Sequence, residues 1–223
     1  MDERKPVPFN KTFFEAEAKK GTDKNVKDKF TFIYESNFWA GGVSVSGEGS
    51  DDLQTAQIKT HLPKLIEQYN IKTMLDLPCG DFNWMKDVNL KLDKYIGGDI
   101  VEEIIELNNQ KYSNSDREFR VLNLIEDELP KADLIFCRDC LVHLSFEDIF
   151  KSIANIKRCG IKYLMTTTFP ECQENKNITT GDWRIINLEL SPFNFPKPLY
   201  LLNENCTEGE GTYKDKSLGL WEV

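Results

Sequence analysis

Residues 73–82 read Thr-Met-Leu-Asp-Leu-Pro-Cys-Gly-Asp-Phe, a short apolar stretch that runs into acidic residues and a turn containing glycine. This pattern is typical of a buried strand followed by a tight turn. In open α/β sheets, ligands bind outside the carboxyl ends of the strands, and a glycine there lets the backbone approach a nucleotide. We therefore expect a cofactor-binding corner just after Leu77.

From residue 71 onward the chain alternates between strand and helix patterns. Ser145 and Asp148 resemble a capping pair at the start of the best-defined helix. Such alternation predicts an α/β fold with a parallel sheet covered by helices on both faces. The predicted strands are Thr73–Leu77, Tyr95–Asp99, Phe119–Leu122, Leu134–Cys137, Tyr163–Phe169, Leu199–Leu202 and Ser217–Val223, and the main helices are Val101–Tyr112 and Phe146–Lys157.

Residues 1–50 differ from residues 51–223 in composition, and we expect them to cover the cofactor site of the main domain. Residues 23–39 are too aromatic for a disordered tail, whereas residues 41–50 form a Gly/Ser loop that either approaches a ligand or only connects. Ser50 is then predicted to cap a helix whose apolar stripe, starting at Leu53, is core. Pro63 should kink or split that helix.

Composition and charge limit the class of protein. The 223 residues suit a single core, and no apolar run approaches a membrane span. A net charge of −9 argues against nucleic acid as a partner. The charged, proline-rich start and the six dispersed cysteines predict a cytoplasmic protein with reduced thiols. Residues 137–140 match C-x-x-C, but only two histidines are available to complete a metal site, so we expect no metal.

Asp99 ends the second predicted strand, about 20 residues beyond the first turn, the offset at which a carboxylate meets ribose hydroxyls. The same residue could also cap the helix that follows. Pro78 and Cys79 occupy the positions where a dinucleotide fingerprint needs glycine, which disfavours an NAD-dependent oxidoreductase. An adenosine cofactor without phosphates remains, and Asp76 and Asp81 favour one that carries a positive charge.

Three segments, residues 75–82, 95–100 and 136–144, resemble those of class I S-adenosylmethionine-dependent methyltransferases. More narrowly, the chain resembles a branch often found near glycan-building genes. That branch has Ser-Val-Ser-Gly-x-Gly-Ser, Asp-x-Pro-Cys-Gly-Asp-Phe, Cys-Arg-Asp-Cys-Leu-Val-His-Leu and Thr-Gly-Asp-Trp-Arg motifs, here at residues 44–50, 76–82, 137–144 and 180–184. The resemblance implies a Rossmann-like, seven-stranded, mostly parallel sheet with an antiparallel last strand, and S-adenosylmethionine as cofactor.

The resemblance also assigns cofactor contacts. Asp76, Gly80 and Asp81 would surround the methionine part, Asp99 the ribose and Asn123 the adenine edge. Trp39, Ser46 and Gly47 would close over the cofactor, and Arg138 would support its carboxylate or a neighbouring loop. The remaining implied contacts are Pro78, Ile100 and Leu124.

Asp139 and His143 follow the fourth predicted strand and are the catalytic candidates. A sugar hydroxyl needs a general base, and we expect His143 in that role with Asp139 orienting it, or the reverse. Both residues could instead only cap the turn before Ser145. Asp182, Trp183 and Arg184 combine an aromatic plate with charged groups, as sugar-binding sites do, although a structural Asp–Arg pair beside a buried tryptophan fits equally well.

The predicted function is therefore methyl transfer from S-adenosylmethionine to a sugar hydroxyl of a glycan or its precursor. We also expect association with glycosyltransferases. The alternatives are a methyltransferase for a small non-sugar metabolite or a nitrogen acceptor, and a non-catalytic cofactor-binding module of the same fold.

Overall fold

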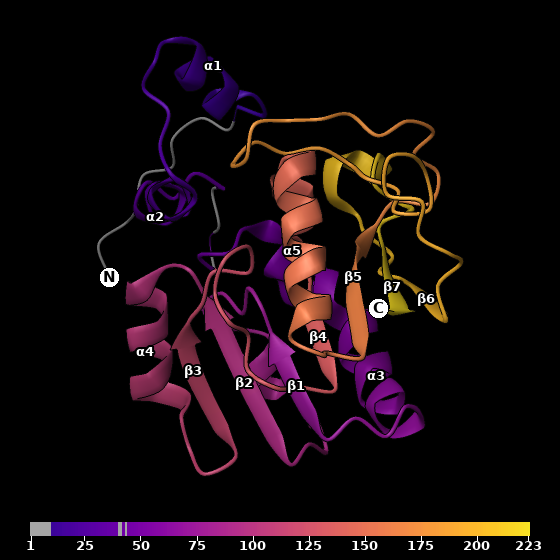
Figure 1. Ribbon diagram of the computed structural model, residues 1–223. Coiled ribbons are helices and arrows are strands. Elements are labelled where there is room, and N and C mark those ends of the chain that lie inside the picture. The colour runs from indigo at the N-terminus through magenta and orange to yellow at the C-terminus, as the bar shows by residue number, and fades with distance from the viewer. Residues whose placement is uncertain (1–9, 40–41, 43) are drawn as a thin grey trace.

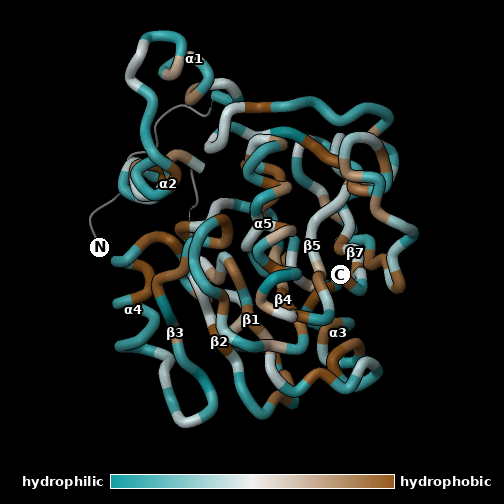
Figure 2. The backbone as a smooth tube through the Cα atoms, in the orientation of Figure 1, coloured by the Kyte–Doolittle hydropathy of each residue, from teal (hydrophilic) through white to brown (hydrophobic). Residues whose placement is uncertain are grey.

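The computed structural model describes residues 10–39, 42 and 44–223 (Figure 1). The charged start of the chain, together with residues 40, 41 and 43 at and within the predicted Gly/Ser loop, lies outside the described residues. Apolar segments gather along the strands and α3 (Asp52–Gln68), whereas the outer loops are largely hydrophilic (Figure 2). Within the described residues, no helix combines the length and apolarity that crossing a membrane requires.

The strands form one seven-stranded sheet in the order β3-β2-β1-β4-β5-β7-β6. Neighbours from β3 to β5 pair in parallel, and β7 runs antiparallel to both β5 and β6. The predicted parallel sheet with an antiparallel last strand is thus confirmed. The bounds are β1 Thr73–Asp76, β2 Lys94–Asp99, β3 Arg117–Val121, β4 Leu134–Cys137, β5 Tyr163–Thr168, β6 Tyr200–Asn203 and β7 Ser217–Glu222.

Helices cover both faces of the sheet because alternate strand residues point to opposite sides. Leu75 and Ile135 pack with α5 (Phe146–Arg158), while their neighbours Met74 and Leu134 pack with α3. Ile105 of α4 (Glu102–Tyr112) joins the α3 side. The predicted cap of α5 is confirmed, since the Ser145 side chain accepts from the Asp148 N–H at 3.1 Å.

Two predictions at α3 are wrong, those for Ser50 and Leu53, and of the two alternatives for Pro63 the split does not occur. The N-cap position is Asp51, because Ser50 belongs to a short 3-10 turn, η1 (Glu48–Ser50), that precedes the helix. Leu53 is 68% exposed, because it lies on the outer face of the helix, whereas Gln54 and Thr55 in the same turn are buried. Pro63 does not split the helix, which continues to Gln68 with Ile58, Leu62, Leu65 and Ile66 buried against the sheet.

Two N-terminal helices, α1 (Phe13–Lys19) and α2 (Val26–Glu35), lie above the carboxyl ends of the strands (Figure 1). Phe14, Ile33 and Phe38 are buried together in a small aromatic cluster with Phe13 and Phe32. We refer to residues 10–39 as the cover. The aromatic segment therefore packs, as its composition predicts.

Candidate active site

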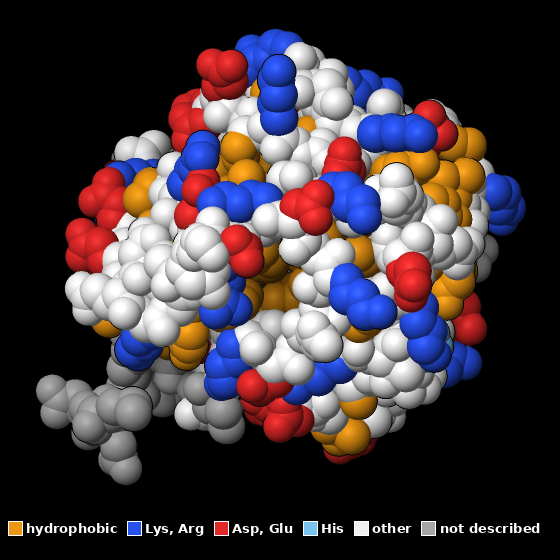
Figure 3. All heavy atoms as spheres, turned by 90° about the horizontal axis from the view of Figure 1, so that it is seen from below, with side chains coloured by type: hydrophobic (Ala, Val, Ile, Leu, Met, Phe, Trp, Pro, Cys, Tyr) orange, Lys and Arg blue, Asp and Glu red, His pale blue; other side chains and the backbone are white. Residues whose placement is uncertain are grey.

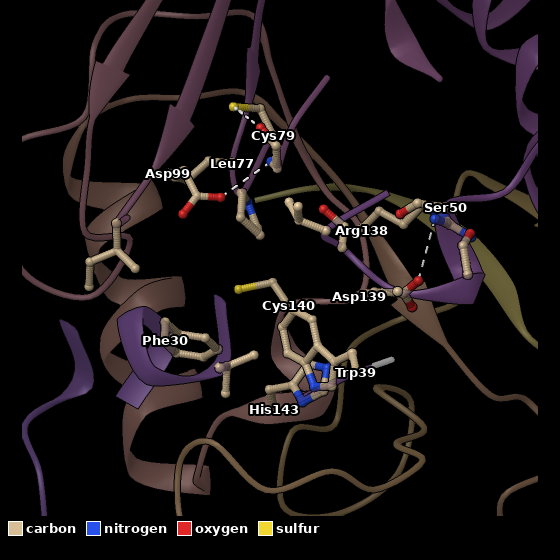
Figure 4. A pocket seen from close by; sticks show the side chains of 18 of the residues that line it. Phe30, Trp39, Ser50, Leu77, Cys79, Asp99, Arg138, Asp139, Cys140 and His143 are labelled. Carbon is tan, nitrogen blue, oxygen red and sulfur yellow. Dashed lines mark hydrogen bonds and ion pairs between the residues drawn. The ribbon is translucent and has the colours of Figure 1, made fainter. Parts of the chain in front are cut away.

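A cavity of about 500 Å³ lies beside the carboxyl ends of β1, β2 and β4 (Figure 4). Both the cover and the sheet line it, which brings together residues far apart in the sequence. Of the predicted site residues, those lining the cavity are Trp39, Ser46, Gly47, Asp76, Pro78, Gly80, Asp81, Asp99, Ile100, Asn123, Leu124, Arg138, Asp139, His143 and Trp183. Asp182 and Arg184 lie behind that surface.

The turn after β1 is fixed by hydrogen bonds from its neighbours. The Gly80 N–H donates to Oδ2 of Asp99 at 3.2 Å, and the Gly80 carbonyl accepts from Asn108 of α4 at 2.7 Å. Gly80 has a φ of +53°, and a Cβ there would lie 2.2 Å from Oγ of Ser46. Only glycine fits this position, because both the backbone conformation and the loop above exclude a side chain.

Two buried carboxylates, Asp76 and Asp99, face the cavity from the ends of β1 and β2. Asp76 accepts a short hydrogen bond from the Tyr95 hydroxyl, and burial raises its pKa to about 7. Asp99 accepts from the backbone of Gly80 and, at 3.0 Å, of Val101, while burial raises its pKa to about 6. Their hydrogen-bond partners are neutral groups, so a positively charged ligand would favour the ionised forms.

Asp81 fastens the loop above the cavity to the turn. Its carboxylate accepts from the Ser44 hydroxyl at 2.9 Å and from the Val45 N–H at 3.1 Å. These bonds hold Ser46 and Gly47 over Gly80, so the loop belongs to the site. Asn123, after β3, lines the cavity and uses Oδ1 to accept from the Ile125 N–H at 3.0 Å.

Beyond β4, five charged side chains form an ion network beneath the cavity. Arg138 donates to Glu204 at 2.7 Å and to the Gly49 carbonyl at 2.8 Å. Lys216 donates to Asp139 at 2.7 Å and lies 3.6 Å from Glu208. Arg138, Glu204 and Lys216 are buried, whereas Asp139 and Glu208 keep part of their carboxylates exposed to the cavity.

Asp139 is held in its charged form. Burial would raise its pKa, but the Lys216 ammonium and the Arg138 guanidinium hold it well below the usual range. Its backbone N–H donates to the Thr167 hydroxyl of β5 at 2.8 Å, in a left-handed conformation with a φ of +51°. A carboxylate stabilised so strongly is suited to accept a hydrogen bond rather than to remove a proton.

The ring of His143, in the 3-10 turn η3 (Leu141–His143), is held from two sides. Its Nδ1 lies 3.0 Å from the Asp182 carbonyl, and its ring lies 4.7 Å from that of Trp39, centroid to centroid (Figure 4). Because a carbonyl only accepts, Nδ1 carries the proton and Nε2 keeps its lone pair. Burial lowers the pKa of His143 to about 4, so the ring is neutral near pH 7.

Residues 180–184 contribute both backbone-binding side chains and an aromatic ring to the site. The Asp182 carboxylate accepts from the backbone of Phe14 at 2.8 Å and of Glu15 at 3.0 Å. Arg184 donates to the carbonyls of Leu141 and Leu144, each at 2.7 Å. The two side chains thus fix the backbone of the cover and of η3. The Trp183 ring lies against Tyr213, with centroids 5.1 Å apart, and reaches the cavity.

Sequence reasoning missed several residues of the site. Tyr95, Asn108, Thr167 and Glu204 were not among the predicted site residues. They do not line the cavity themselves, but they form hydrogen bonds with four residues that do, Asp76, Gly80, Asp139 and Arg138. Glu208, Tyr213 and Lys216 also line the cavity. The described residues contain no group of three or more His, Cys, Asp or Glu placed to hold a metal ion.

No family model and no curated protein matches the chain. Solved structures, in contrast, match its fold. Human N-acetylserotonin methyltransferase, in complex with SAM, is 14% identical, with a TM-score of 0.60 over 96% of this chain and 62% of that one. A S-adenosylmethionine-dependent methyltransferase from Clostridium acetobutylicum is 12% identical, with a TM-score of 0.57 over 89% and 99%. N-methyltransferase NodS from Bradyrhizobium japonicum is 12% identical, with a TM-score of 0.57 over 77% and 97%.

The chain has the class I methyltransferase fold. Its strand order and its antiparallel β7 agree with that arrangement. In this fold the cavity occupies the position that the sequence predicts for a cofactor, outside the carboxyl ends of the parallel strands.

Proposed function

We propose that the chain is an S-adenosylmethionine-dependent O-methyltransferase that methylates a sugar hydroxyl of a glycan or its precursor. The observation that carries the proposal is the placement of His143. Its neutral ring, with a lone pair on Nε2, lines the same cavity as the buried carboxylates Asp76 and Asp99. A proton acceptor and a pocket suited to a charged nucleoside therefore share one space.

The chemistry of the cavity fits the cofactor. Asp76 and Asp99 are buried beside neutral partners, so the positive charge of a sulfonium ligand would compensate them. Solved structures that share the fold include one in complex with SAM and one, DhpI, in complex with SAH. When bound, S-adenosylmethionine supplies a methyl group activated by a positively charged sulfur.

Each cofactor contact has a proposed role. Asp99 accepts the ribose hydroxyls, Asn123 contacts the adenine edge, and Asp76 and Asp81 face the charged methionine part, on the turn that Gly80 permits. The residues proposed to complete the binding surface are Trp39, Ser46, Gly47, Pro78, Ile100, Leu124 and Arg138, the last of which acts through the loop it binds at Gly49.

His143 is the proposed base, and Nε2 accepts the proton of the acceptor hydroxyl. Asp139 remains ionised beside Lys216 and orients that hydroxyl by accepting a hydrogen bond. Trp183 is the proposed surface on which the sugar ring packs, because its ring faces the same cavity. Asp182 and Arg184 support the site from behind through their backbone contacts.

A sugar acceptor also agrees with the surface charge. Lys and Arg side chains alternate with Asp and Glu over the face in Figure 3, without a continuous basic area of the kind that nucleic acid needs. Together with the net charge of −9, this supports an uncharged polyhydroxyl acceptor rather than a nucleic acid. Association with glycosyltransferases and a cytoplasmic location belong to the same proposal.

A nitrogen acceptor is the second candidate, because burial makes His143 a weak base with a pKa of about 4. A neutral amine attacks without prior loss of a proton, so it does not need a base in the reacting step. NodS, which shares the fold, is an N-methyltransferase.

An assay with S-adenosylmethionine labelled in the methyl group would test the proposal. The purified chain is expected to transfer label to mono- and oligosaccharide acceptors, producing a methyl ether that mass spectrometry locates on oxygen. His143→Asn should lower kcat by roughly 100-fold or more, the usual contribution of a general base, with little effect on cofactor affinity.

His61→Asn is the matched control, because His61 lies on α3 and is the other histidine of the chain. It is expected to leave turnover unchanged. Label found only on amines would overturn the sugar proposal, and unchanged turnover in His143→Asn would overturn the base assignment. Cofactor binding with no transfer to any acceptor would favour the non-catalytic module.

A further inference from the structure

One residue, Asp182, contacts both the cover and His143. Its two carboxylate oxygens accept from the Phe14 and Glu15 N–H groups, at 2.8 and 3.0 Å, in the first turn of α1. Thr12, at the N-cap position of α1, makes no side-chain cap. Asp182 therefore supplies the cap from 168 residues away in the sequence.

The backbone of the same residue orients the imidazole. The Asp182 carbonyl accepts from Nδ1 of His143 at 3.0 Å, and the adjacent Gly181 N–H donates to the His143 carbonyl at 2.8 Å. The tautomer of His143 thus depends on the position of the backbone of Gly181 and Asp182. Only with Nδ1 protonated is Nε2 a proton acceptor.

The cover packs directly against the backbone of Gly181. Gly181 has a φ of +103°, and a Cβ there would lie 2.6 Å from the Phe14 ring. Glycine is needed because the ring occupies the space that a side chain would fill. On its other face, His143 contacts Trp39, which follows α2. Movement of α1 would therefore act on the backbone of residues 181 and 182, which holds His143.

We propose that Asp182 is a positioning residue that couples the seating of α1 to the orientation of His143. The imidazole then presents Nε2 to the acceptor only while the cover is seated over the cavity. The inference rests on the proposed function for the role of His143 in turnover, whereas the coupling itself is a property of the folded chain without substrate. Its benefit is that proton removal is confined to the closed site.

The decisive variant is Asp182→Asn. An amide nitrogen cannot accept from an N–H, so one of the two bonds to α1 is lost while the backbone carbonyl remains. We expect hydrogen exchange of the Phe14 and Glu15 amides to accelerate roughly fivefold, the effect of losing a cap. In a sample labelled with ¹⁵N at histidine, the His143 signals should shift from the Nδ1–H form toward a mixture of tautomers.

The chain contains an internal reference for that spectrum. His61, the other of the two histidines, also places Nδ1 near a carbonyl, that of Gln57 at 2.8 Å, but within α3. Its signals should be identical in the wild type and in Asp182→Asn. Asp28→Asn, which makes the same chemical change on the exposed first turn of α2, is the matched control and should alter neither histidine.

Phe14→Leu approaches the coupling from the other side, because it loosens the contact with Gly181 and leaves Asp182 intact. The proposal expects the same shift of His143, and an effect in the double variant smaller than the sum of the two. This variant also answers the question if Asp182→Asn fails to fold. Turnover in either variant should fall roughly tenfold in kcat, with the cofactor Kd unchanged within about twofold.

Faster exchange in α1 with unchanged His143 signals would overturn the coupling, and so would unchanged exchange in Asp182→Asn. These readouts need no acceptor. If His143→Asn retains full turnover, the proposed base fails while the spectra still decide the coupling, so the two failures are distinguishable.

Discussion

At the ends of β1 and β2, the buried carboxylates Asp76 and Asp99 are hydrogen-bonded to a hydroxyl and to backbone N–H groups. At the end of β4, the carboxylates of Asp139 and Glu204 lie beside Lys216 and Arg138. Burial therefore raises the pKa of Asp76 and Asp99, whereas ion pairing lowers the pKa of Asp139. We call Asp76 and Asp99 the uncompensated half of the site, because only the charge of a bound ligand would balance their negative charges. Asp139 and Glu204, with Lys216 and Arg138, are the compensated half, because their charges are balanced within the folded chain.

The largest expected effect is a loss of stability when a cation is removed from the ion network of the compensated half. Lys216→Met leaves Asp139, Glu204 and Glu208 with a single cation, Arg138. Removing one partner of a buried ion pair costs about 3–5 kcal/mol, because the remaining charge stays buried. Urea unfolding should report a loss of this size.

Lys214→Met is the control for that measurement, because Lys214 pairs with Glu171 at 3.5 Å on the exposed surface. Its free energy of unfolding should change by less than about 0.5 kcal/mol. Equal stability of Lys216→Met and wild type would show that the network is not compensated as described.

The next largest effect concerns ligand binding in the uncompensated half. Asp99→Asn removes a charged hydrogen-bond acceptor, worth about 1.5–3 kcal/mol, so the Kd for S-adenosylhomocysteine should rise roughly 10- to 100-fold. Calorimetry would measure it, with the exposed Asp116→Asn as control. An unchanged Kd would contradict the proposed contact between Asp99 and the ribose.

A smaller effect is expected from pH. The raised pKa values, about 7 for Asp76 and about 6 for Asp99, mean that both carboxylates ionise fully only as the pH rises through this window. A sulfonium favours the ionised forms, so the affinity for S-adenosylmethionine should increase from pH 5 to pH 8, by up to about tenfold. S-adenosylhomocysteine, which lacks that charge, should show a flatter dependence.

The sign for stability without ligand is opposite. Between the ordinary pKa of about 3.9 and the raised values, the folded chain holds protons that the unfolded chain releases. This stabilisation is complete below about pH 4 and is lost as the pH rises toward 7. Asp76→Asn should therefore flatten that part of the curve, and parallel affinity curves for the two ligands would contradict the uncompensated assignment.

The smallest effect is expected at the edge of the compensated half. Glu208 lies 3.6 Å from Lys216 and is partly exposed, so Glu208→Gln should change the free energy of unfolding by less than about 1 kcal/mol. Thermal unfolding of Glu208→Gln, compared with that of Lys216→Met, would show whether the buried residues of the network contribute most of its stability. A loss as large as that of Lys216→Met would place Glu208 among them.

The fold was predictable because its signals are local. The strand Leu134–Cys137 is predicted to the residue, since a short apolar run ends at a charged Arg138. Ser145 caps α5 because its hydroxyl reaches an N–H three residues ahead. Ser50 offered the same signal and failed, because the neighbouring glycines fold it into η1 and shift the helix start by one residue.

The site was predictable where it follows the ends of strands and not where it depends on packing. Asp76, Asp99 and Asp139 are found from their position after apolar runs. The contacts of Asp76 with Tyr95, of Asp139 with Lys216 and of Arg138 with Glu204 depend on the pairing of strands that are distant in the chain, which no spacing in the sequence encodes. Asp182 is the clearest case, since its motif is visible but its contact with α1 is not.

The loop at residues 44–50 has a consequence for any shortened version of the protein. Gly49 gives its carbonyl to Arg138, and the carboxylate of Asp81 is occupied by Ser44 and Val45. A chain begun at Asp51 would leave one guanidinium N–H of Arg138 without its partner and Asp81 with a single backbone hydrogen bond, from the Asn83 N–H at 3.2 Å. The composition changes near residue 50, but the contacts of the site cross that point. A fragment cut there is therefore expected to fold poorly and to bind the nucleoside weakly.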